Sequence, residues 1–546
     1  MKFSPPVAVL MPLLSLAIGS GVASANDIYI AQTAAGSNNG QGCANAYAYT
    51  FFNSSANWGT GANQIGPGTT VHLCGTFTVP GGATGLTAQR DGAAGNPVTV
   101  VFETGAVLQS AYFAGGGNGG AVNIAGRSYI VIDGGIACGA TQGGVDSSNT
   151  CNGTIQNTAN GSSPTYANQQ YSIAIVASGS TGCEIRNLLV RNMYVRTSLS
   201  DVSVTNDVAS AVVALPATGL RIHDSTFHDA SWVFKLAGTN LQFYNNNLYN
   251  FDHGIAVGQG GSNTTAFLIH DNHFHDMAAW DDSTGNNSYH HDGIHIWIGS
   301  TETDQAYVYN NTFDGDPGQN TGGRTGPNGW IYDEGGLTNS YIFNNTFLTS
   351  NPNTTFPSEV GEFSSSNFVI NNTVTGGAGS AGNSLGVANS NQSVFNNIVG
   401  GSQYTMALNA GTTLAVYNLA AGTGIDSNVY VTSGGTVFGY PTSGTNSLSA
   451  WQSALPAGSG QDLHATVGTA AQINLTSDGR IGPNSTAAAR GQNLSPLCAA
   501  NPYLGPLCRD KAGNPRPSTG AWDPGAYNAS NSSSPSPPSG LTGSAH

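Results

Sequence analysis

One pattern of apolar and polar positions recurs along the middle of the chain: an aliphatic residue or Phe, a variable residue, Asn or Asp, two variable residues, and an apolar residue. It occurs as IRNLLV (185–190), IHDSTF (222–227), FYNNNL (243–248), IHDNHF (269–274), VYNNTF (308–313), IFNNTF (342–347), VINNTV (369–374) and VFNNIV (394–399). The basic repeat is 21–27 residues long, with occasional insertions. This period predicts a solenoid of strand-based coils. Helical repeats fit poorly, because no segment sustains an apolar period of 3.6 residues.

A single coil of this length is too small to bury its own apolar face, so coils stack and share a continuous core. Strands of successive coils then pair in parallel, about 4.8 Å apart. We expect the recurrent Asn or Asp to form a ladder of stacked side chains, at positions 187, 224, 245, 271, 310, 344, 371 and 396. The earlier segments VTVVFE (98–103) and YIVIDGG (129–135) look like degenerate coils of the same kind.

These coils resemble the right-handed parallel β-helix superfamily of pectate lyases and polygalacturonases, the pectin-lyase-like fold, over roughly residues 90–430. The resemblance implies an all-β solenoid and a secreted enzyme that acts on polysaccharides. We expect an N-terminal cap over 26–90, the β-helix over 91–430, an irregular closing segment over 431–528 and a disordered Ser/Pro-rich tail over 529–546. The segments at 478–494 and 510–527 resemble those that close secreted bacterial β-helix proteins.

Composition narrows the class of partner. Charged residues make up 8% of the chain, and 29 acids against 14 bases give a net charge of -15, whereas ordinary domains carry about 25% charged residues. A charged helical bundle or coiled coil is excluded, because its wet faces need Glu, Lys and Arg. Clustered bases are absent, so neither a nucleic acid nor an anionic membrane surface is an expected partner.

The first 25 residues read as a signal peptide, with Lys2 as the charged start, an apolar stretch over 7–18 and the small residues Ala23-Ser24-Ala25 at the cleavage site. We therefore expect a soluble monomer that is secreted to the periplasm or the extracellular space. Export permits disulfides, although sequence alone does not fix their connectivity. The sequence-local pairs are Cys43–Cys74, Cys138–Cys151 and Cys498–Cys508, which leave Cys183 alone. No two cysteines have the close spacing of zinc sites, so no metal is expected.

Titratable residues are concentrated in one band of coils. Residues 201–362 hold 18 of the 29 acids, and nine of the 12 histidines lie between His223 and His295. Surface solvation alone would spread these residues more evenly. We interpret four of them as structural, because they occupy ladder positions: His223, Asp224, His270 and Asp271.

Alignment of the second strand of each coil gives a common apolar position at Phe234, Ile255, Ile294, Trp330, Val360 and Leu385. Because side chains alternate along a strand, stacked coils would present their polar groups at one outward place. The predicted patch contains Lys235, Asp252, His253, His291, Asp292, His295, Trp297, Asp333, Glu334, Glu359 and Glu362. Trp280, Tyr289 and Arg324 lie in long insertions that are expected to wall a cleft, where the aromatic rings would stack on sugars.

Clustered carboxylates supply what glycosidic cleavage needs, since one acid protonates the leaving oxygen and another activates water or attacks the sugar. The predicted catalytic residues are Asp292, Asp333, Glu334, Asp252, His291 and Lys235, and the predicted substrate-binding residues are His253, His295, Trp297, Trp280, Tyr289, Arg324 and Glu362. Coil spacing would place Asp292 roughly 5 Å from Asp333 or Glu334, near the retaining distance. Asp252 and Asp333 would lie about 9–10 Å apart, close to the inverting range.

The stretch Asp292-Gly293-Ile294-His295 is similar to the Asn-Thr-Asp-Gly-Ile-His motif of polygalacturonases, whose Asp is one of the catalytic carboxylates. Here His290-His291 replace Asn-Thr, and Asp333-Glu334 correspond to the Asp-Asp pair of the family's next coil. The family's later Gly-His-Gly and Arg-x-Lys motifs, which bind the uronate, have no match downstream. Galacturonan is therefore not implied as the substrate.

Three functions remain open. The first is a glycoside hydrolase that acts on a polysaccharide without a cofactor. The second is a polysaccharide lyase, with Lys235 as the base and Ca²⁺ held by Asp252, Asp292 and Glu362. The third is a non-catalytic glycan-binding or adhesin-like surface protein, in which the acids are incidental.

Overall fold

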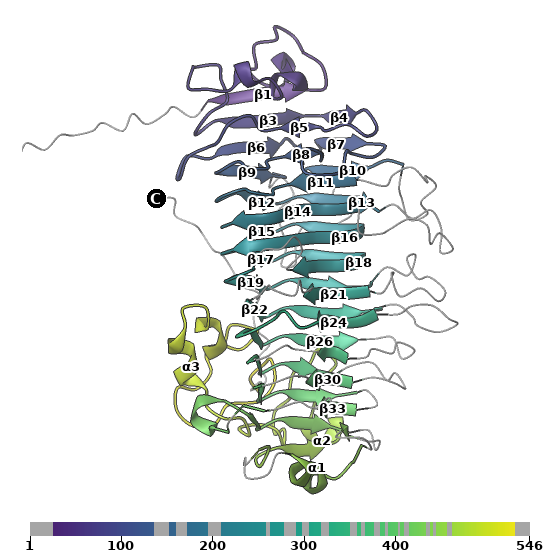
Figure 1. Cartoon of the computed structure of the whole chain (residues 1–546), viewed down its shortest axis with the longest axis vertical. Coiled ribbons are helices and arrows are strands. Elements are labelled where there is room, and N and C mark those ends of the chain that lie inside the picture. The colour runs from purple at the N-terminus through teal and green to yellow at the C-terminus, as the bar shows by residue number, and fades with distance from the viewer. Residues whose placement is uncertain are drawn as a thin grey trace, which may run out of the picture.

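The coils build three ladders of parallel strands that run from one end of the molecule to the other (Figure 1). The computed structural model describes residues 26–135, 152–159, 172–194, 209–257, 263–277, 291–296, 305–317, 327–349, 358–361, 366–375, 383–387, 391–401, 404–408, 414–415, 417–432, 437–439, 444–455 and 461–529. Within these ranges, every pairing between two named strands is parallel, which confirms the predicted β-helix.

The first ladder forms a sheet of its own. Its strands, in order along the stack, are β2 (Tyr47–Ala48), β1 (Asp27–Ala31), β3 (Thr70–Cys74), β6 (Val98–Phe102), β9 (Ile130–Asp133), β12 (Glu184–Arg186), β15 (Arg221–His223), β17 (Gln242–Tyr244), β19 (Phe267–His270), β22 (Ala306–Tyr309), β25 (Tyr341–Phe343), β28 (Phe368–Ile370), β31 (Ser393–Phe395) and β34 (Ile425–Asp426). Residues 26–90, predicted as a cap, thus already contribute strands to the stack.

The second and third ladders share two long strands, β16 (Thr226–Thr239) and β18 (Asn247–Val257), and so belong to one sheet. The second ladder also contains β4 (Thr76–Val79), β7 (Val107–Ser110), β10 (Thr154–Asn157), β13 (Leu189–Met193), β20 (His273–His275), β23 (Thr312–Gly315), β26 (Thr346–Thr349), β29 (Thr373–Val374), β32 (Ile398–Gly400), β35 (Val429–Val431) and β37 (Thr466–Gly468). The third contains β5 (Leu86–Thr87), β8 (Val122–Asn123), β11 (Ser172–Val176), β14 (Ala209–Thr218), β21 (His291–Ile296), β24 (Pro327–Asp333), β27 (Ser358–Gly361), β30 (Asn383–Val387), β33 (Tyr404–Leu408) and β36 (Phe438–Gly439).

Helices are short and lie outside the ladders. They are α1 (Leu448–Ala454), α2 (Ala470–Ile473) and α3 (Ser495–Ala500), with 3₁₀ turns η1 (Cys43–Asn45), η2 (Tyr49–Phe51), η3 (Ser55–Asn57), η7 (Leu419–Ala421) and η8 (Gly505–Cys508). Among the described residues, no helix has the length and apolar character needed to cross a membrane.

A ladder of stacked asparagines runs along the turn between the first and second ladders, but one residue later than predicted. Each side-chain amide donates to the next carbonyl oxygen at 2.9–3.1 Å, through Asn246, Asn272, Asn311, Asn345, Asn372, Asn397 and Asn428. The eight predicted positions instead hold the turn residue itself, with φ of 52–58°. This left-handed conformation, which Asn and Asp tolerate, turns the chain so that the following side chain lies inside the stack. The predicted positions give scattered contacts, such as Asn396 to Asn371 at 3.2 Å.

The four residues interpreted as structural form adjacent pairs at these turns. His223 Nδ1 lies 2.6 Å from Asp224, and His270 Nδ1 lies 2.7 Å from Asp271. The two imidazoles stack on either face of Tyr244, with ring centroids 4.5 and 5.1 Å away. Part of the histidine-rich band therefore stabilises the coils.

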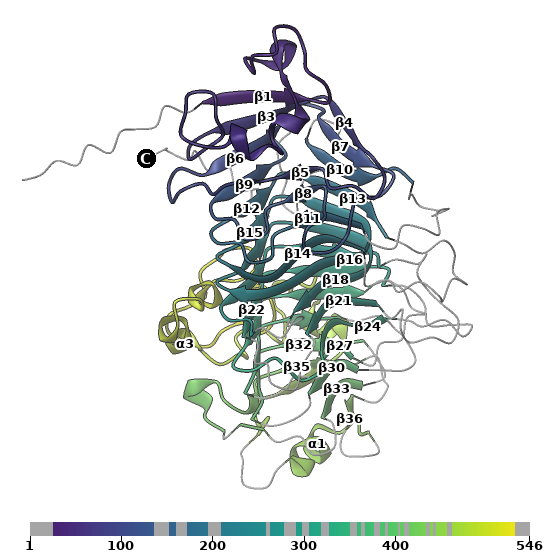
Figure 2. The same cartoon turned by 45° about the horizontal axis from the view of Figure 1, so that its top comes forward.

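The end of the described chain packs along the side of the stack, where α3 lies in both views (Figures 1 and 2). An apolar cluster joins Tyr307, Tyr309, Phe343, Ile370 and Phe395 of the first ladder to Leu494, Leu504, Leu507 and Trp522. Arg516 donates to Asn344 Oδ1 at 2.9 Å, and Lys511 donates to the carbonyl of Asn310. Burial lowers the pKa of Lys511 to about 7 and that of Arg516 to about 10.

Two of the predicted disulfides are present, Cys43–Cys74 and Cys498–Cys508, and Cys183 is free and buried. Burial raises the pKa of the Cys183 thiol. The remaining predicted pair, Cys138–Cys151, lies outside the described residues, as do the predicted signal peptide and all but the first residue of the predicted tail.

Candidate active site

The register of the third ladder sets which side chains meet. Phe234, Ile255, Ile294, Ile331, Val360 and Leu385 occupy one position of successive coils. The predicted alignment of Trp330 is wrong by one residue, because the pairing of β21 with β24 shifts between His291 and Asp292. In consequence His295 pairs with Tyr332, and Ile296 pairs with Asp333.

Strands β18 and β21 bring imidazoles and carboxylates into one alternating row that ends at Glu334, directly after β24. The order of the row is His291, Asp252, His253, Asp292, His295 and Glu334. His291 Nε2 lies 4.0 Å from Asp252 Oδ1, and Asp252 Oδ2 lies 3.2 Å from His253 Nδ1. Asp292 Oδ2 lies 3.2 Å from both His253 Nε2 and His295 Nδ1, and His295 Nε2 lies 3.7 Å from Glu334 Oε2. We call this set the imidazole–carboxylate row. It connects the interior to the surface.

Exposure differs sharply along the row. The first five residues are at most 1% exposed, whereas the side chain of Glu334 is 39% exposed. Burial lowers the pKa of His295, but the charges of Asp292 and Glu334 and their hydrogen bonds outweigh burial and raise it to about 9. Glu334 is therefore the member of the row that a polymer in solution can contact.

Two glycines allow the row to form. Asp292 and His295 are three residues apart, a spacing that places side chains on opposite faces of a regular strand, yet both contact the same neighbour, His253. Gly293 lies between them, and a Cβ there would lie 2.5 Å from the carbonyl oxygen of Trp330. A Cβ on Gly254 of the preceding coil would lie 2.4 Å from the carbonyl oxygen of Gly293. A side chain at either position would therefore force the neighbouring backbone to shift.

Trp232 and Lys235 of β16 extend the site by one coil. The indole of Trp232 stacks on His253 with a centroid distance of 4.2 Å, and Lys235 Nζ lies 4.7 Å from the centre of the indole. The strand register places Lys235, Ala256, His295 and Tyr332 at one position of four successive coils. The predicted Lys235 thus belongs to the same neighbourhood as the row.

Asp333 has a different setting from the one predicted. Its Oδ1 accepts hydrogen bonds from the backbone N–H groups of Gly335, Gly336 and Leu337, at 2.9, 2.9 and 3.2 Å. These contacts fix the turn after β24 and so orient Glu334. The predicted close approach of Asp292 and Glu334 is replaced by an arrangement in which opposite nitrogens of His295 face the two carboxylates.

His253, Asp292 and His295 each offer one ligand atom within 4.8 Å of the others, a set that can hold a metal ion. The spacing of the cysteines, from which no metal was expected, does not indicate this set. The sequence features that could have indicated it are the Asp-His pair at 252–253 and the Asp-x-x-His spacing at 292–295.

The predicted substrate-binding residues Trp280, Tyr289, Trp297, Arg324 and Glu362 lie outside the described residues. Glu359, a predicted member of the patch, is fully buried in β27. The catalytic and substrate-binding roles of all the named residues stay predictions.

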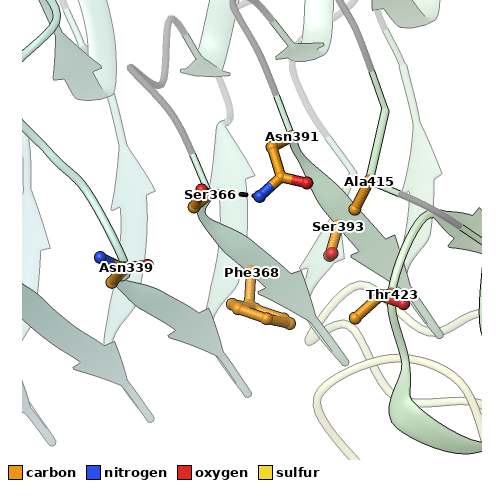
Figure 3. A pocket seen from close by; sticks show the side chains of 7 residues that line it. All are labelled: Asn339, Ser366, Phe368, Asn391, Ser393, Ala415 and Thr423. Carbon is orange, nitrogen blue, oxygen red and sulfur yellow. Dashed lines mark hydrogen bonds between the residues drawn. The ribbon is translucent and has the colours of Figure 1, made fainter.

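A separate hollow of about 280 Å³ lies over the starts of β25, β28 and β31 (Figure 3). Its lining residues are Asn339, Ser366, Phe368, Asn391, Ser393, Ala415 and Thr423. Asn391 Nδ2 donates to Ser366 Oγ at 2.7 Å across two neighbouring turns. None of these lining residues has a titratable side chain.

No protein-family model matches the chain, and no curated protein matches it. Among solved structures, it is similar to the pectate lyase Pel9A, at 14% identity over 94% of this chain and 98% of that chain, with a TM-score of 0.42. It is also similar to XylC in complex with xylose, at 9% identity over 81% of this chain and 82% of that chain, with a TM-score of 0.39. A GH136 lacto-N-biosidase from Eubacterium ramulus is similar at 10% identity over 71% of this chain and 67% of that chain, with a TM-score of 0.40. Likenesses at this level do not identify an activity. The strand pairing of the chain itself shows a parallel β-helix.

Proposed function

We propose that this protein is a secreted carbohydrate-active enzyme that cleaves a polysaccharide by hydrolysis, with Glu334 as the carboxylate that meets the substrate. The observation that carries the proposal is the imidazole–carboxylate row, which ends in a solvent-exposed carboxylate on a long strand ladder. A ladder of stacked coils offers an elongated surface, which suits an extended polymer.

The chemistry follows from the position of Glu334. Glycosidic hydrolysis uses two carboxyl groups, one to protonate the leaving oxygen and one to activate water or attack the sugar. Glu334 would supply one of these two groups. Glu334 is held from one side by His295 at 3.7 Å, and its backbone N–H donates to the carbonyl of Ile296 at 3.1 Å. Asp292 Oδ2 lies 3.2 Å from the other ring nitrogen of His295, Nδ1. Asp292 therefore fixes the imidazole and acts as a positioning residue.

The test is a panel of neutral and weakly acidic glycans. We expect new reducing ends without the ultraviolet absorbance of an unsaturated uronate, and we expect Glu334→Gln to reduce kcat/KM at least 100-fold, the scale of one acid–base group. Glu103→Gln is a matched control, because Glu103 is also 39% exposed and also pairs with a histidine, His72, at 2.6 Å. Full activity in Glu334→Gln, or no cleavage of any glycan, would contradict the proposal.

A polysaccharide lyase is the second candidate, and Lys235 favours it. This side chain lies on Trp232, next to the row, and shares its strand position with His295 two coils away. Elimination would give an unsaturated uronate in place of simple reducing ends. It would also make activity depend on Lys235, so that Lys235→Met abolishes cleavage while Glu334→Gln retains it.

A further inference from the structure

The strongest cluster of ligand-type atoms in the described chain lies at the centre of the imidazole–carboxylate row. Asp292 Oδ2 is 3.2 Å from His253 Nε2 and 3.2 Å from His295 Nδ1. Zinc binds imidazole nitrogen at about 2.0–2.1 Å and carboxylate oxygen at about 2.0–2.2 Å, and neighbouring ligands in a tetrahedron with these bond lengths are roughly 3.3 Å apart. The two observed separations match that edge, and all three ligand atoms lie within 4.8 Å of one another.

Both histidines also have a carboxylate on their other nitrogen. Asp252 Oδ2 lies 3.2 Å from His253 Nδ1, and Glu334 Oε2 lies 3.7 Å from His295 Nε2. Metal-binding histidines almost always have such a partner, which fixes the tautomer and the direction of the ring. His291, 4.0 Å from Asp252, supports that carboxylate in turn.

The site is rigid as well as convergent. All three ligand residues are at most 1% exposed, and the indole of Trp232 stacks on the ring of His253. Two neighbouring coils supply the ligands through one hydrogen-bonded register, in which His253 pairs with Asp292. The ligand atoms are thus preorganised by the strand ladder, whereas an accidental surface cluster would be mobile.

The donor set selects the class of metal. Ca²⁺ and Mg²⁺ take oxygen ligands, whereas two imidazoles and one carboxylate suit Zn²⁺ and related divalent transition metals. Three protein ligands leave coordination positions open for water or substrate. Glu334 lies at the exposed end of the row, with its Oε2 3.7 Å from Nε2 of the ligand residue His295.

We propose that His253, Asp292 and His295 form a binding site for one divalent transition-metal ion, with Zn²⁺ as the ion to test. Asp252 and Glu334 orient the two imidazoles. This site differs from the Ca²⁺ site that the sequence suggested for a lyase, and the proposal holds whether or not the protein cleaves glycans, because its readout is metal binding alone.

The first experiment uses the untagged, full-length protein, freed of metal with a chelator and titrated with Zn²⁺ in competition with a fluorescent zinc indicator. We expect one tight Zn²⁺ per chain that excess Ca²⁺ does not displace. His253→Gln and His295→Gln should each lose this tight binding, and Asp252→Asn should weaken it about 10–100-fold, the usual effect of losing an orienting partner.

The matched control is His72→Gln. His72 also lies between two carboxylates, with Nδ1 2.6 Å from Glu103 and Nε2 3.4 Å from Asp27, but among the described residues these three do not form a set of ligand atoms within 4.8 Å of one another. Its loss should leave the tight site intact. Equal Zn²⁺ binding by wild type and His253→Gln, or displacement of Zn²⁺ by Ca²⁺, would overturn the proposal.

A second measurement needs no variant and so does not depend on folding. X-ray absorption of the Zn²⁺-loaded wild-type protein should show two imidazole ligands with bonds of about 2.0–2.1 Å. A spectrum with oxygen ligands alone would overturn the assignment. If the row is held together by hydrogen bonds alone and binds no metal, the protein will show no stoichiometric zinc signal. That result would also overturn the proposal.

Discussion

At the scale of single residues, the candidate site depends as much on two glycines as on its charged groups. Gly254 and Gly293 let neighbouring coils approach at the point where Asp292 and His295 turn to the same side. The titratable groups then meet at 3.2–4.0 Å, and all of them except Glu334 are buried. Charged groups in such a position need partners, and the alternation of imidazole with carboxylate supplies one for each.

Replacement of Gly293 by Ala tests this dependence. The new Cβ would lie 2.5 Å from the carbonyl oxygen of Trp330, so strand β21 or β24 must move. We expect a loss of about 1–3 kcal/mol in the free energy of unfolding, together with loss of the activity or metal binding of the row. Gly117→Ala is the control, because a Cβ there meets no atom within 4 Å. Equal denaturation midpoints for the two variants would contradict this account.

Glu184 allows a prediction about acid stability. Burial raises its pKa, but the hydrogen bond with His223 and the charges of Arg186 and Arg221 outweigh burial and lower it to about 2, from an ordinary value of 4.5. A carboxyl whose pKa is lowered on folding stabilises the protein above the unfolded pKa and loses that contribution as the pH falls. We expect Glu184→Gln to be less stable than wild type above pH 4.5, and the difference to shrink between about pH 4.5 and 2. Urea denaturation across this range measures it, and a pH-independent difference would contradict the assignment.

At the scale of elements, the repeat pattern predicted the coils well but their fine register poorly. Apolar residues at a spacing of 21–27 residues require stacking, whatever the turn geometry. Runs such as NNN at 245–247 do not show which Asn adopts the left-handed conformation, so the ladder was predicted one residue early. Likewise Trp330 and Ile331 are both apolar and both fully buried, so the pattern could not choose between them.

The same limit applies to the site. The density of acids and histidines pointed to the coils that hold the row, and the predicted patch contained all six of its members. It could not separate the His–Asp pairs that brace turns, such as His223–Asp224, from those that meet across coils. That distinction depends on the close approach of the backbones at Gly293 and on the register shift beside it, both of which are tertiary features.

The asparagine ladder should contribute strongly to stability. Asn345 accepts from both the backbone N–H and the side chain of Asn311, and it donates to Asn372 and to the carbonyl of Val308. Replacement by Ala leaves buried partners unsatisfied, at a cost of about 1–3 kcal/mol each. We expect Asn345→Ala to lower the thermal midpoint markedly, whereas Ala at the exposed Asn118 should leave it unchanged. Similar midpoints would show that water replaces the lost amide.

At the scale of the whole molecule, each coil contacts only its neighbours, so the stack can open locally from an end. The Cys43–Cys74 disulfide ties the segment around η1 to β3 at one such end. Toward the other end of the described chain, residues 494–522 pack on the side of the stack and bridge several coils.

Loss of the Cys43–Cys74 disulfide should therefore have a local effect. Closing a loop of 31 residues is worth about 3–4 kcal/mol in the chain-entropy model. We expect the Cys43→Ser, Cys74→Ser double variant to exchange amide hydrogens faster in β1 and β3 but at an unchanged rate in β21 and β24. Uniformly faster exchange along the stack would indicate that the molecule opens as one unit.

The side packing of the last described residues has a consequence for the order of assembly. Arg516 contacts Asn344, 172 residues earlier, and Lys511 contacts Asn310, 201 residues earlier. A ribosome that synthesises about 5–20 residues per second therefore releases Asn344 roughly 9–34 seconds before Arg516 exists. Until residues 494–522 follow, the aromatic side chains Tyr309, Phe343 and Phe395 have no cover from Leu494 or Trp522. The coils can wind as the chain emerges, but this side of the stack stays open to other chains until residues 494–522 have been made.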